Sequence, residues 1–258
     1  MITLYARSLE TQQPDSLFQD PKAVEIAQAT DYDFEKYAKG WASKLSTVIR
    51  VQEFDCIAKD FLQENPNAIV INLGCGLCTR FTRIDNGSVR WYEVDFPEVI
   101  ALRRQFFEES DRYHFIAKSI LDFTWIDTIQ RQPGQPLLIL MEGVSPYLSE
   151  TENRDLISHV QARLAPLELV FDALNRKTAN RSKKHDTVSK TEAEFKSGID
   201  SGQELEAWNS NITLKNEIYY LKQFADYPQR LPLWARYLSP LLVILFKSSS
   251  QILQLKIE

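Results

Sequence analysis

Two groups of residues, set about 20 positions apart, have the types and spacing to bind the ribose of a nucleoside ligand. Gly74 and Gly76 follow the apolar run 69–73 in a Gly-x-Gly turn. Lacking side chains, they would leave room for a ligand at the carboxyl end of a strand, where open α/β sheets bind their ligands. Glu93 and Asp95 end the next apolar run, and a carboxylate there can accept hydrogen bonds from ribose hydroxyls. The two acids share one strand face, so position alone does not decide between them, although Asp95 lies nearer the strand end.

The glycine turn lacks one part of the dinucleotide-binding fingerprint. That fingerprint continues Gly-x-Gly-x-x-Gly, whereas the sixth position here is Thr79. Without the third glycine, the close helix contact and the cradle for a pyrophosphate are lost. An adenosyl ligand without phosphates needs only the glycine gap and the ribose acceptor, so the sequence favours S-adenosylmethionine over a nicotinamide cofactor. A nicotinamide-dependent oxidoreductase and an adenosyl-binding protein without catalysis are the alternatives.

The cysteines and histidines do not complete a metal motif. Cys75 and Cys78 have the Cys-x-x-Cys spacing of a redox dithiol or of half a zinc site, but no second cysteine pair or nearby histidine completes a tetrahedral site. We therefore expect no metal. The three histidines are scattered, and His185 is a candidate catalytic residue because it lies in the polar segment 175–211.

The order of elements that would position these residues is typical of an α/β protein. From about residue 45 onward, apolar runs of strand length alternate with helix-period segments, which predicts a largely parallel sheet covered on both faces. The expected strands are 68–73, 89–94, 113–117, 137–141, 167–172, 212–220 and 252–257, and the expected helices include 47–62, 99–109 and 150–164. Ser149 and Glu152 have the spacing of a capping box, which predicts the start of the last of these helices.

The segment 175–211 interrupts this rhythm after the fifth strand. It is polar and rich in Lys, Ser, Thr and Asn, which predicts a lid insertion. A basic group within it either forms an ordinary solvated face or attracts an acidic substrate. This group consists of Arg176, Lys177, Arg181, Lys183 and Lys184.

Length and charge limit the class of protein. A chain of 258 residues with 44% hydrophobic residues can form one domain, 1–258, in which 1–45 is an N-terminal cover. The formal net charge of −5 argues against nucleic acid or anionic lipid as partners. The apolar run 241–246 is far shorter than the roughly 20 residues that span a bilayer, so we expect a buried helix there and no membrane segment. The start of the chain lacks a signal-peptide pattern and there are only three cysteines, so a cytoplasmic location is expected.

Motifs spread over most of the chain follow the pattern of a known family. They are DSLFQDPKA at 15–23, NLGCGLCTR at 72–80, EVDFP at 93–97 and MEGVSPYL at 141–148. These motifs resemble those of the leucine carboxyl methyltransferase family. FKSGI at 195–199 and ELEAW at 204–208 are similar to the lid of its bacterial branch, the tetracenomycin-type polyketide O-methyltransferases.

The resemblance implies both a fold and an activity. The fold would be that of a class I S-adenosylmethionine-dependent methyltransferase, a Rossmann-like, seven-stranded and mostly parallel sheet with helices on both faces. The activity would be methyl transfer to an oxygen of a small-molecule acceptor, polyketide-like or another secondary metabolite. Arg50 would pair with the carboxylate of the cofactor's methionine part, as suits a guanidinium. Gly74 and Gly76 would line the cofactor's path, Asp95 would hold the ribose, and Glu142 would face the cationic methionine end.

The chain departs from the family pattern at two places. The family's Asp-Leu-Arg segment after the third strand is replaced by one that begins Ser119-Ile120 and is followed by Asp122. Either Ser119 or Asp122 would then meet the adenine amino group. Cys78 stands where the family usually has Asp, so we expect any pairing of that Asp with Arg80 to be absent.

The chemical class of the acceptor oxygen can be narrowed by asking whether it must lose a proton before methyl transfer. A carboxylate, with a reference pKa near 4, is ionised at neutral pH, whereas a phenol, with a pKa near 10, needs a base to remove its proton. No dedicated base stands out in the sequence, which favours a carboxylate. Tyr147 or His185 could serve a hydroxyl acceptor.

Overall fold

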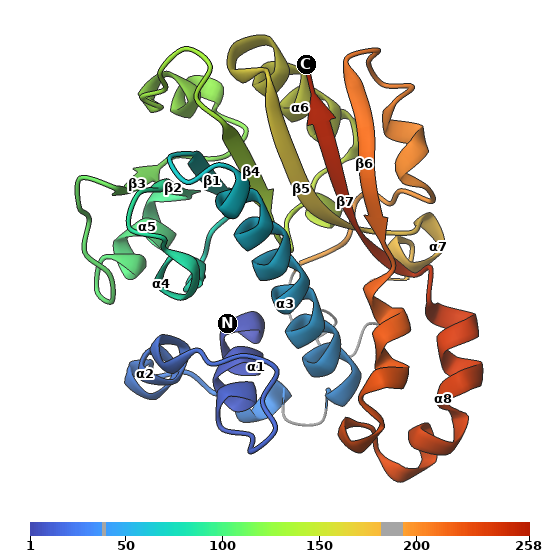
Figure 1. The fold of residues 1–258 in the computed structure, drawn as a ribbon. Helices are drawn as coiled ribbons and strands as arrows, with labels where there is room; N and C mark the ends of the chain where they lie inside the picture. Colours follow the sequence, from blue (N-terminus) through green and yellow to red (C-terminus); the bar gives the residue numbers. More distant parts are fainter. Residues whose placement is uncertain (38–39, 182–192) are drawn as a thin grey trace.

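Seven strands form one twisted sheet at the centre of the molecule (Figure 1). The computed structural model describes residues 1–37, 40–181 and 193–258. The strands are β1 (Ile69–Leu73), β2 (Arg90–Asp95), β3 (Tyr113–Ala117), β4 (Leu137–Met141), β5 (Leu167–Leu174), β6 (Ile212–Ile218) and β7 (Ser250–Ile257). Their order across the sheet is β3-β2-β1-β4-β5-β7-β6, and β7 alone runs antiparallel to both of its neighbours. The predicted seven-stranded, mostly parallel α/β fold is confirmed.

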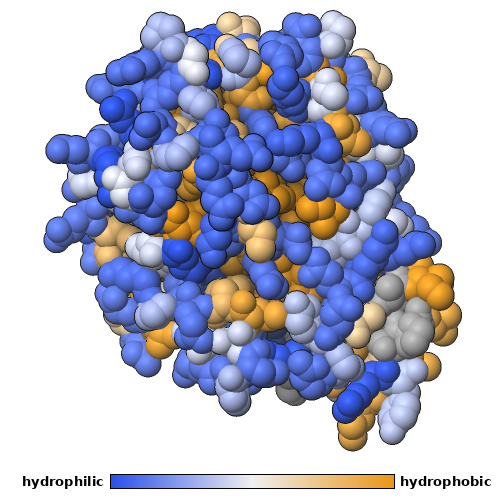
Figure 2. All heavy atoms as spheres, viewed as in Figure 1, coloured by the Kyte–Doolittle hydropathy of each residue, from blue (hydrophilic) through white to orange (hydrophobic). Residues whose placement is uncertain are grey.

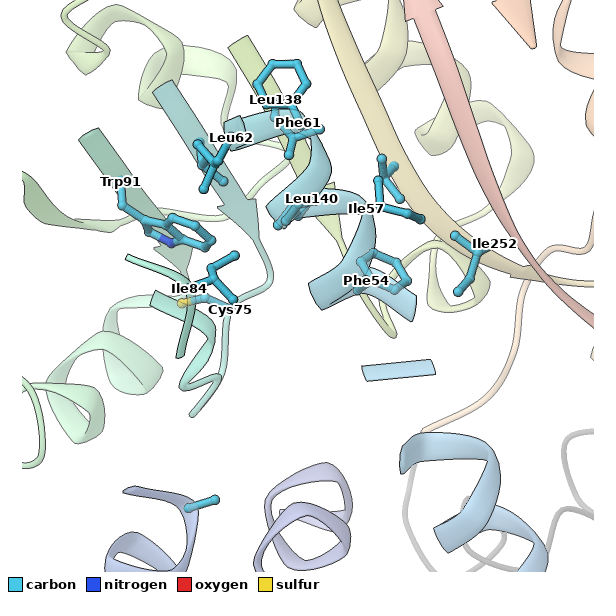
Figure 3. Packing of buried hydrophobic residues seen from close by; sticks show 14 of the residues in the cluster. Phe54, Ile57, Phe61, Leu62, Cys75, Ile84, Trp91, Leu138, Leu140 and Ile252 are labelled. Atoms are coloured by element: carbon cyan, nitrogen blue, oxygen red, sulfur yellow. The ribbon is translucent and has the colours of Figure 1, made fainter. Parts of the chain in front are cut away.

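The central strands are apolar along their whole length because both faces of the sheet are covered. Every residue of β1 and of β4 is buried. Val70 faces the same side as α3 (Trp41–Glu64), whereas Ile71 faces the side covered by α6 (Glu150–Leu164). Figure 3 shows Phe61 of α3 near Leu138 of β4 and Phe54 of the same helix toward Ile252, and these side chains share one apolar cluster with Leu140 and Trp91.

The covering helices differ from the predicted ranges mainly at their ends. The capping box of Ser149 and Glu152 starts α6 as predicted. However, α3 begins at Trp41, before the expected start at 47, and α5 (Pro97–Arg103) ends before the expected residue 109. The amides of Gln105 and Phe106 bond three residues back, to Leu102 and Arg103, so the chain turns instead of continuing the helix. The short α4 (Arg80–Ile84) follows the glycine turn.

The N-terminal helices lie at the carboxyl ends of the parallel strands (Figure 1). They are α1 (Ile2–Thr11) and α2 (Pro21–Ala29), followed by the short helix η1 (Glu35–Tyr37). α1 packs against both α2 and α3. Asp20 caps α2 by accepting a hydrogen bond from the amide of Ala23 at 3.0 Å. This position puts α1 over the edge of the sheet where ligands bind in α/β proteins.

Short helical turns carry the remaining connections of the chain. They are η2 (Phe123–Thr128), η3 (Ser145–Tyr147), α7 (Arg176–Ala179), η6 (Gly202–Leu205), η7 (Tyr220–Asp226) and η8 (Pro228–Arg230). Within the segment 175–211, Arg176 forms ion pairs with Asp200 at 3.0 Å and with Glu204 at 2.5 Å. The charge of Arg176 is therefore neutralised within the segment. Lys183, Lys184 and His185 lie outside the described residues.

The apolar run near the C-terminus forms the helix α8 (Leu233–Phe246), and the expectation that it is buried is wrong. Leu241, Ile244 and Phe246 are each more than half exposed. The physical reason is that α8 lies beyond the edge of the sheet, where, among the described residues, it packs mainly against η7 and η8 (Figure 1). No helix in residues 1–37, 40–181 and 193–258 combines the length and the apolar character that crossing a membrane requires.

Candidate functional site

A cavity of about 270 Å³ lies between α1 and the carboxyl ends of β1, β4 and β5. Five of the predicted site residues line it: Arg50, Gly74, Gly76, Glu142 and Tyr147. Further lining residues were not predicted as site residues, and those with charged, amide or hydroxyl side chains are Thr3, Arg7, Ser43, Ser46, Thr47, Asn72, Asp172, Tyr220 and Ser250. Glu93, Asp95, Ser119, Ile120 and Asp122 are not part of this wall.

The two glycines of the turn serve different purposes. Both have a positive φ, +67° at Gly74 and +49° at Gly76, a conformation that other residues rarely adopt. A Cβ at Gly74 would overlap Cγ2 of Val144, so packing requires glycine there. A Cβ at Gly76 would meet no atom within 4 Å. The open space expected for a ligand therefore lies at Gly76.

Asp95 lies beside this turn. Its Oδ2 accepts a hydrogen bond from the amide of Gly76 at 2.7 Å, and its Oδ1 accepts one from the amide of Phe96 at 2.8 Å. Burial raises the pKa of the Asp95 carboxyl, although these two amides oppose the shift. Each carboxylate oxygen can accept a further hydrogen bond, so Asp95 still has the capacity to bind a hydroxyl.

Glu93 has a different environment, although it shares the strand face of Asp95. It is fully buried, and its carboxylate forms an ion pair with Arg103 at 2.8 Å and accepts a hydrogen bond from Asn72 at 2.7 Å. Arg103 also donates to the carbonyl oxygens of Gly76 at 2.9 Å and of Cys78 at 2.8 Å. Glu93 thus fixes the arginine that holds the glycine turn, and Asp95 as the ribose acceptor stays a prediction.

Arg50 lies between two acids at the floor of the cavity. Its Nε donates to Glu142 at 3.1 Å, and its Nη1 donates to Asp172 at 3.0 Å. Asp172, near the end of β5, also accepts a hydrogen bond from the amide of Gly143 at 2.5 Å. Burial raises the pKa of Asp172 despite the nearby Arg50. For Glu142, burial also acts to raise the pKa, but Arg80 and Arg50 outweigh it and lower the pKa to about 2.

These residues belong to a larger chain of buried ion pairs. Eight charged side chains of alternating sign, four basic and four acidic, link β5 to the N-terminal helices. In order, they are Asp172, Arg50, Glu142, Arg80, Asp55, Arg83, Asp20 and Arg7. Because the charges cancel, each group has a partner that offsets its removal from water. Loss of one member would leave its neighbour charged and buried.

Arg80 keeps strong partners even though Cys78 replaces the expected Asp. Its guanidinium forms ion pairs with Glu142 at 2.6 Å and with Asp55 at 2.7 Å. The Cys78 sulfur lies 3.7 Å from Nη1 of the same arginine. Asp55, on α3, therefore supplies the carboxylate that position 78 lacks.

Arg7 connects α1 to the glycine turn. Its Nη2 donates to the carbonyl oxygen of Leu77 at 2.7 Å, and its Nε forms the ion pair with Asp20 at 3.0 Å. Thr79 also donates a hydrogen bond to Asp20, at 2.5 Å. The residue at the place of the third fingerprint glycine thus binds the N-terminal cap of α2.

The two candidates for the adenine contact both have local partners. Ser119 Oγ accepts a hydrogen bond from the amide of Leu121 at 3.2 Å. Asp122 is exposed and accepts hydrogen bonds from the amide and hydroxyl of Thr124, which lower the pKa of its carboxyl. Ile120, between them, is buried. The assignment of the adenine contact stays a prediction.

The groups that could remove a proton from an acceptor are few. Tyr147 lines the cavity, and burial raises the pKa of its phenol. Burial also raises the pKa of Tyr220, to about 12. His114 lies against Tyr92, outside the cavity wall, and His159 stacks on Phe123 at a ring distance of 3.8 Å. Within the described residues, no imidazole lines the cavity.

The Cys-x-x-Cys pair also lies at the cavity wall. Cys75 is buried, which raises the pKa of its thiol well above its usual value, and Cys78 is half-buried. In the part of the chain that the structure describes, no group of three or more His, Cys, Asp or Glu side chains could hold a metal ion.

The wall of the cavity also carries apolar side chains. Met1, Ile2 and Leu4 come from the start of the chain, Leu174 ends β5, and Phe195 lies within the segment 175–211. The ring of Phe195 lies 5.3 Å from that of Tyr147. One cavity therefore combines a floor of charged side chains with walls that carry apolar side chains.

Comparison with known proteins shows to which family this chain is similar. The sequence model of the family described as leucine carboxyl methyltransferase matches residues 1–161. The tetracenomycin polyketide synthesis O-methyltransferase TcmP of Streptomyces glaucescens is 33% identical over 208 residues, which cover 80% of this chain and 76% of that protein. The S-adenosyl-L-methionine-dependent methyltransferase dpfgK of Gibberella zeae is 28% identical, over 67% of this chain and 64% of that protein.

Solved structures share the fold at much lower sequence identity. Geranyl diphosphate methyltransferase, solved in complex with S-adenosylmethionine, superposes with a TM-score of 0.54 and 13% identity, covering 84% of this chain and 90% of its own. This likeness concerns the sheet and its covering helices alone.

Proposed function

The chain belongs to the leucine carboxyl methyltransferase family, and we propose that this S-adenosylmethionine-dependent methyltransferase methylates a carboxylate oxygen of a small, polyketide-like acceptor. The observation that carries the proposal is the position of Arg50 between Glu142 and Asp172, at the floor of a cavity bordered by the glycine turn. The charges there match those of the cofactor's methionine end.

The residues present fit S-adenosylmethionine, which carries a carboxylate, an ammonium and a sulfonium group. Within the described residues, Nη2 of Arg50 has no hydrogen-bond partner, and it can therefore bind a carboxylate. Glu142 and Asp172 line the cavity beside Arg50, and their carboxylates can face the ammonium and sulfonium groups of the cofactor. Asp95, beside the open space at Gly76, can accept hydrogen bonds from the ribose.

Bound S-adenosylmethionine supplies an electrophilic methyl group, so the protein mainly has to align the acceptor oxygen and exclude water. We assign Arg50 and Glu142 to holding the methionine end. The helix α1, fixed through Arg7 to the glycine turn, lines one side of the cavity and would shield the methyl group from water.

A carboxylate acceptor suits this cavity better than a phenol. A phenol with a pKa near 10 has to lose its proton, whereas a carboxylate is already ionised. Glu142, with a pKa of about 2 and two arginine partners, is a poor base at neutral pH. The raised pKa values of Tyr147 and Tyr220 favour their protonated forms. The basic group of the segment 175–211 adds less support, because Arg176 is paired within that segment.

No observation favours a nicotinamide-dependent oxidoreductase. Thr79, at the place of the third fingerprint glycine, is fully buried and donates to Asp20. It therefore leaves no cradle for a pyrophosphate at the start of α4.

The proposal can be tested with matched aromatic acceptors that differ in one group, a benzoic acid and the corresponding phenol. The enzyme, S-adenosylmethionine and each acceptor are incubated, and the methylated product is treated with mild alkali and followed by mass spectrometry. We expect methylation of the acid, and loss of the added methyl group in alkali, because esters hydrolyse and ethers do not. An alkali-resistant product from the phenol alone would contradict the carboxylate assignment. Binding of NAD but not of S-adenosylhomocysteine by calorimetry would contradict the cofactor assignment.

A further inference from the structure

The helix α8 presents a row of large apolar side chains to solvent. Six of its exposed apolar residues are Leu233 (73%), Trp234 (57%), Tyr237 (84%), Leu238 (47%), Leu241 (54%) and Ile244 (65%), and Phe246, which is also exposed, lies outside the side that these six share. We call these six residues the α8 face. In Figure 2, apolar surface gathers at the lower right of the molecule, where Figure 1 places α8.

The six residues share one side of the helix. At 100° per residue, their positions fall within an arc of about 140°. Ala235, which lies outside this arc, is fully buried. α8 packs against η7 and η8, and the edge of Trp234 meets Trp41 at a ring distance of 5.9 Å. The body of the protein thus buries the side of Ala235 and touches the α8 face at Trp234, while all six residues of the face stay 47–84% exposed.

The area of the α8 face corresponds to that of a stable protein interface. The exposed fractions amount to roughly 800 Å² of accessible surface, whereas the largest apolar patch on a typical monomer is about 300–600 Å². A standard interface buries about 800 Å² on each partner. At about 25 cal/mol per Å², leaving this surface in water is strongly unfavourable.

The charges of the protein favour a second copy of this chain, and not a membrane, as the partner that covers the α8 face. Arg236 is the one charged residue in the sequence of α8, and it lies outside the arc of the α8 face. Two copies can therefore meet face to face without opposing like charges. Helices that lie on membranes usually combine their apolar face with several lysines or arginines that attract anionic lipid, whereas this chain has a formal net charge of −5.

We propose that the α8 face is the interface of a homodimer, in which the α8 of each copy covers that of the other around a two-fold axis. The contact is isologous, so the same residues are buried on both copies. Tyr220 of η7, which packs beside α8, lines the cavity, and the interface therefore borders the element that carries one wall of the site.

The test is the mass of the full-length protein in solution, measured by light scattering after size exclusion at about 1–100 μM, a range in which moderate self-association changes the mass. We expect twice the chain mass of 29.9 kDa for the wild type. The variant Tyr237→Glu/Leu241→Glu places two negative charges at the centre of the α8 face and should give 29.9 kDa. Ala101→Glu, at an exposed position of α5, is the control and should remain a dimer.

Both substituted residues are exposed, so the double variant should fold, and an unchanged circular-dichroism spectrum and unchanged affinity for S-adenosylhomocysteine verify this. A wild type that stays at 29.9 kDa over the whole range would overturn the proposal. Persistence of the dimer in Tyr237→Glu/Leu241→Glu would overturn it as well. A monomeric wild type that floats with phosphatidylcholine–phosphatidylglycerol vesicles would assign the α8 face to membrane binding instead.

Discussion

The guanidinium of Arg50 donates from Nε to Oε1 of Glu142 at 3.1 Å, across 92 positions of the sequence. The pair joins the long helix α3 to the loop after β4, and so it sets the distance between two sides of the cavity. Asp172 holds a second nitrogen of the same guanidinium, which fixes the plane of that group. This fixed geometry is the basis of the first prediction.

Arg50→Ala should impair binding of S-adenosylmethionine by about 1–3 kcal/mol, or about 5- to 150-fold in Kd, since a hydrogen bond to a charged group is lost. Calorimetry measures the affinity, and circular dichroism checks that the variant is folded. Arg104→Ala removes an arginine from an exposed ion pair with Glu109 and should leave the affinity unchanged. If Arg50→Ala unfolds and the folded fraction binds normally, Arg50 is structural.

Asp95→Ala should weaken cofactor binding by about 1–3 kcal/mol, because ribose hydroxyls lose a charged acceptor. Glu93→Gln should have the opposite profile: lower stability, since Arg103 loses its buried ionic partner, and a smaller effect on affinity. Melting temperature and calorimetric Kd, measured on both variants, separate the two roles. A normal Kd for Asp95→Ala would remove Asp95 from the site.

Glu142 should make stability depend on pH in the acid range. Its folded-state pKa of about 2 lies below the usual 4.5, so its ionised carboxylate stabilises the fold above pH 4.5 and this contribution is lost as the pH falls toward 2. Denaturant unfolding of the wild type and of Glu142→Gln should show a difference in free energy that narrows below pH 4.5. The raised pKa values of Glu93 and Asp172 change stability with pH in the opposite direction. Both residues are present in the wild type and in Glu142→Gln, so they contribute to both measurements. A difference that stays constant with pH would contradict this role.

The two glycines should respond differently to substitution by alanine. Gly74→Ala should lower stability more, because its Cβ overlaps Val144 in addition to the cost of a positive φ, about 1 kcal/mol. Val144→Ala, added to Gly74→Ala, should restore part of that loss. Gly76→Ala should instead weaken cofactor binding, since the space there is open. Equal losses of stability for both single variants, with no rescue, would be inconsistent with this division.

Tyr147→Phe should keep kcat for a carboxylic acid within about threefold of the wild type, far from the loss of about 10²–10⁴ that follows removal of a general base. His185→Ala should behave in the same way. The assay is methyl transfer to the benzoic acid used above, measured from pH 6 to about 9, where the profile should remain flat. A hundredfold loss in either variant would identify that residue as a base and point to a hydroxyl acceptor.

Features that depend on neighbouring residues were predictable from the sequence. The apolar runs of β1 and β4 are buried on both faces, so composition alone identified them. The start of α6 followed from the capping box of Ser149 and Glu152. The order of strands and helices then placed the glycine turn at the edge of the sheet where the cavity lies.

Features that depend on distant partners were not predictable in this way. The partnership of Asp172 with Arg50 spans 122 positions, and that of Arg7 with the carbonyl of Leu77 spans 70. An acid at the end of the apolar strand β5 was the one local signal for Asp172. The apolar character of α8 indicated burial, but composition does not say whether the fold provides a layer to cover it.

The buried ion-pair chain also constrains how this protein can diverge. Each inner member forms ion pairs with two neighbours, as Arg80 does with Asp55 and Glu142. A neutral replacement at one position therefore leaves a buried, unpaired charge on both sides. Substitutions within the ion-pair chain are therefore tolerated only when an acid and its basic partner change together. Relatives should accordingly differ there by whole acid–base pairs, and grafting a single segment from one relative into another should yield insoluble hybrids more often than a swap of the connected segments together.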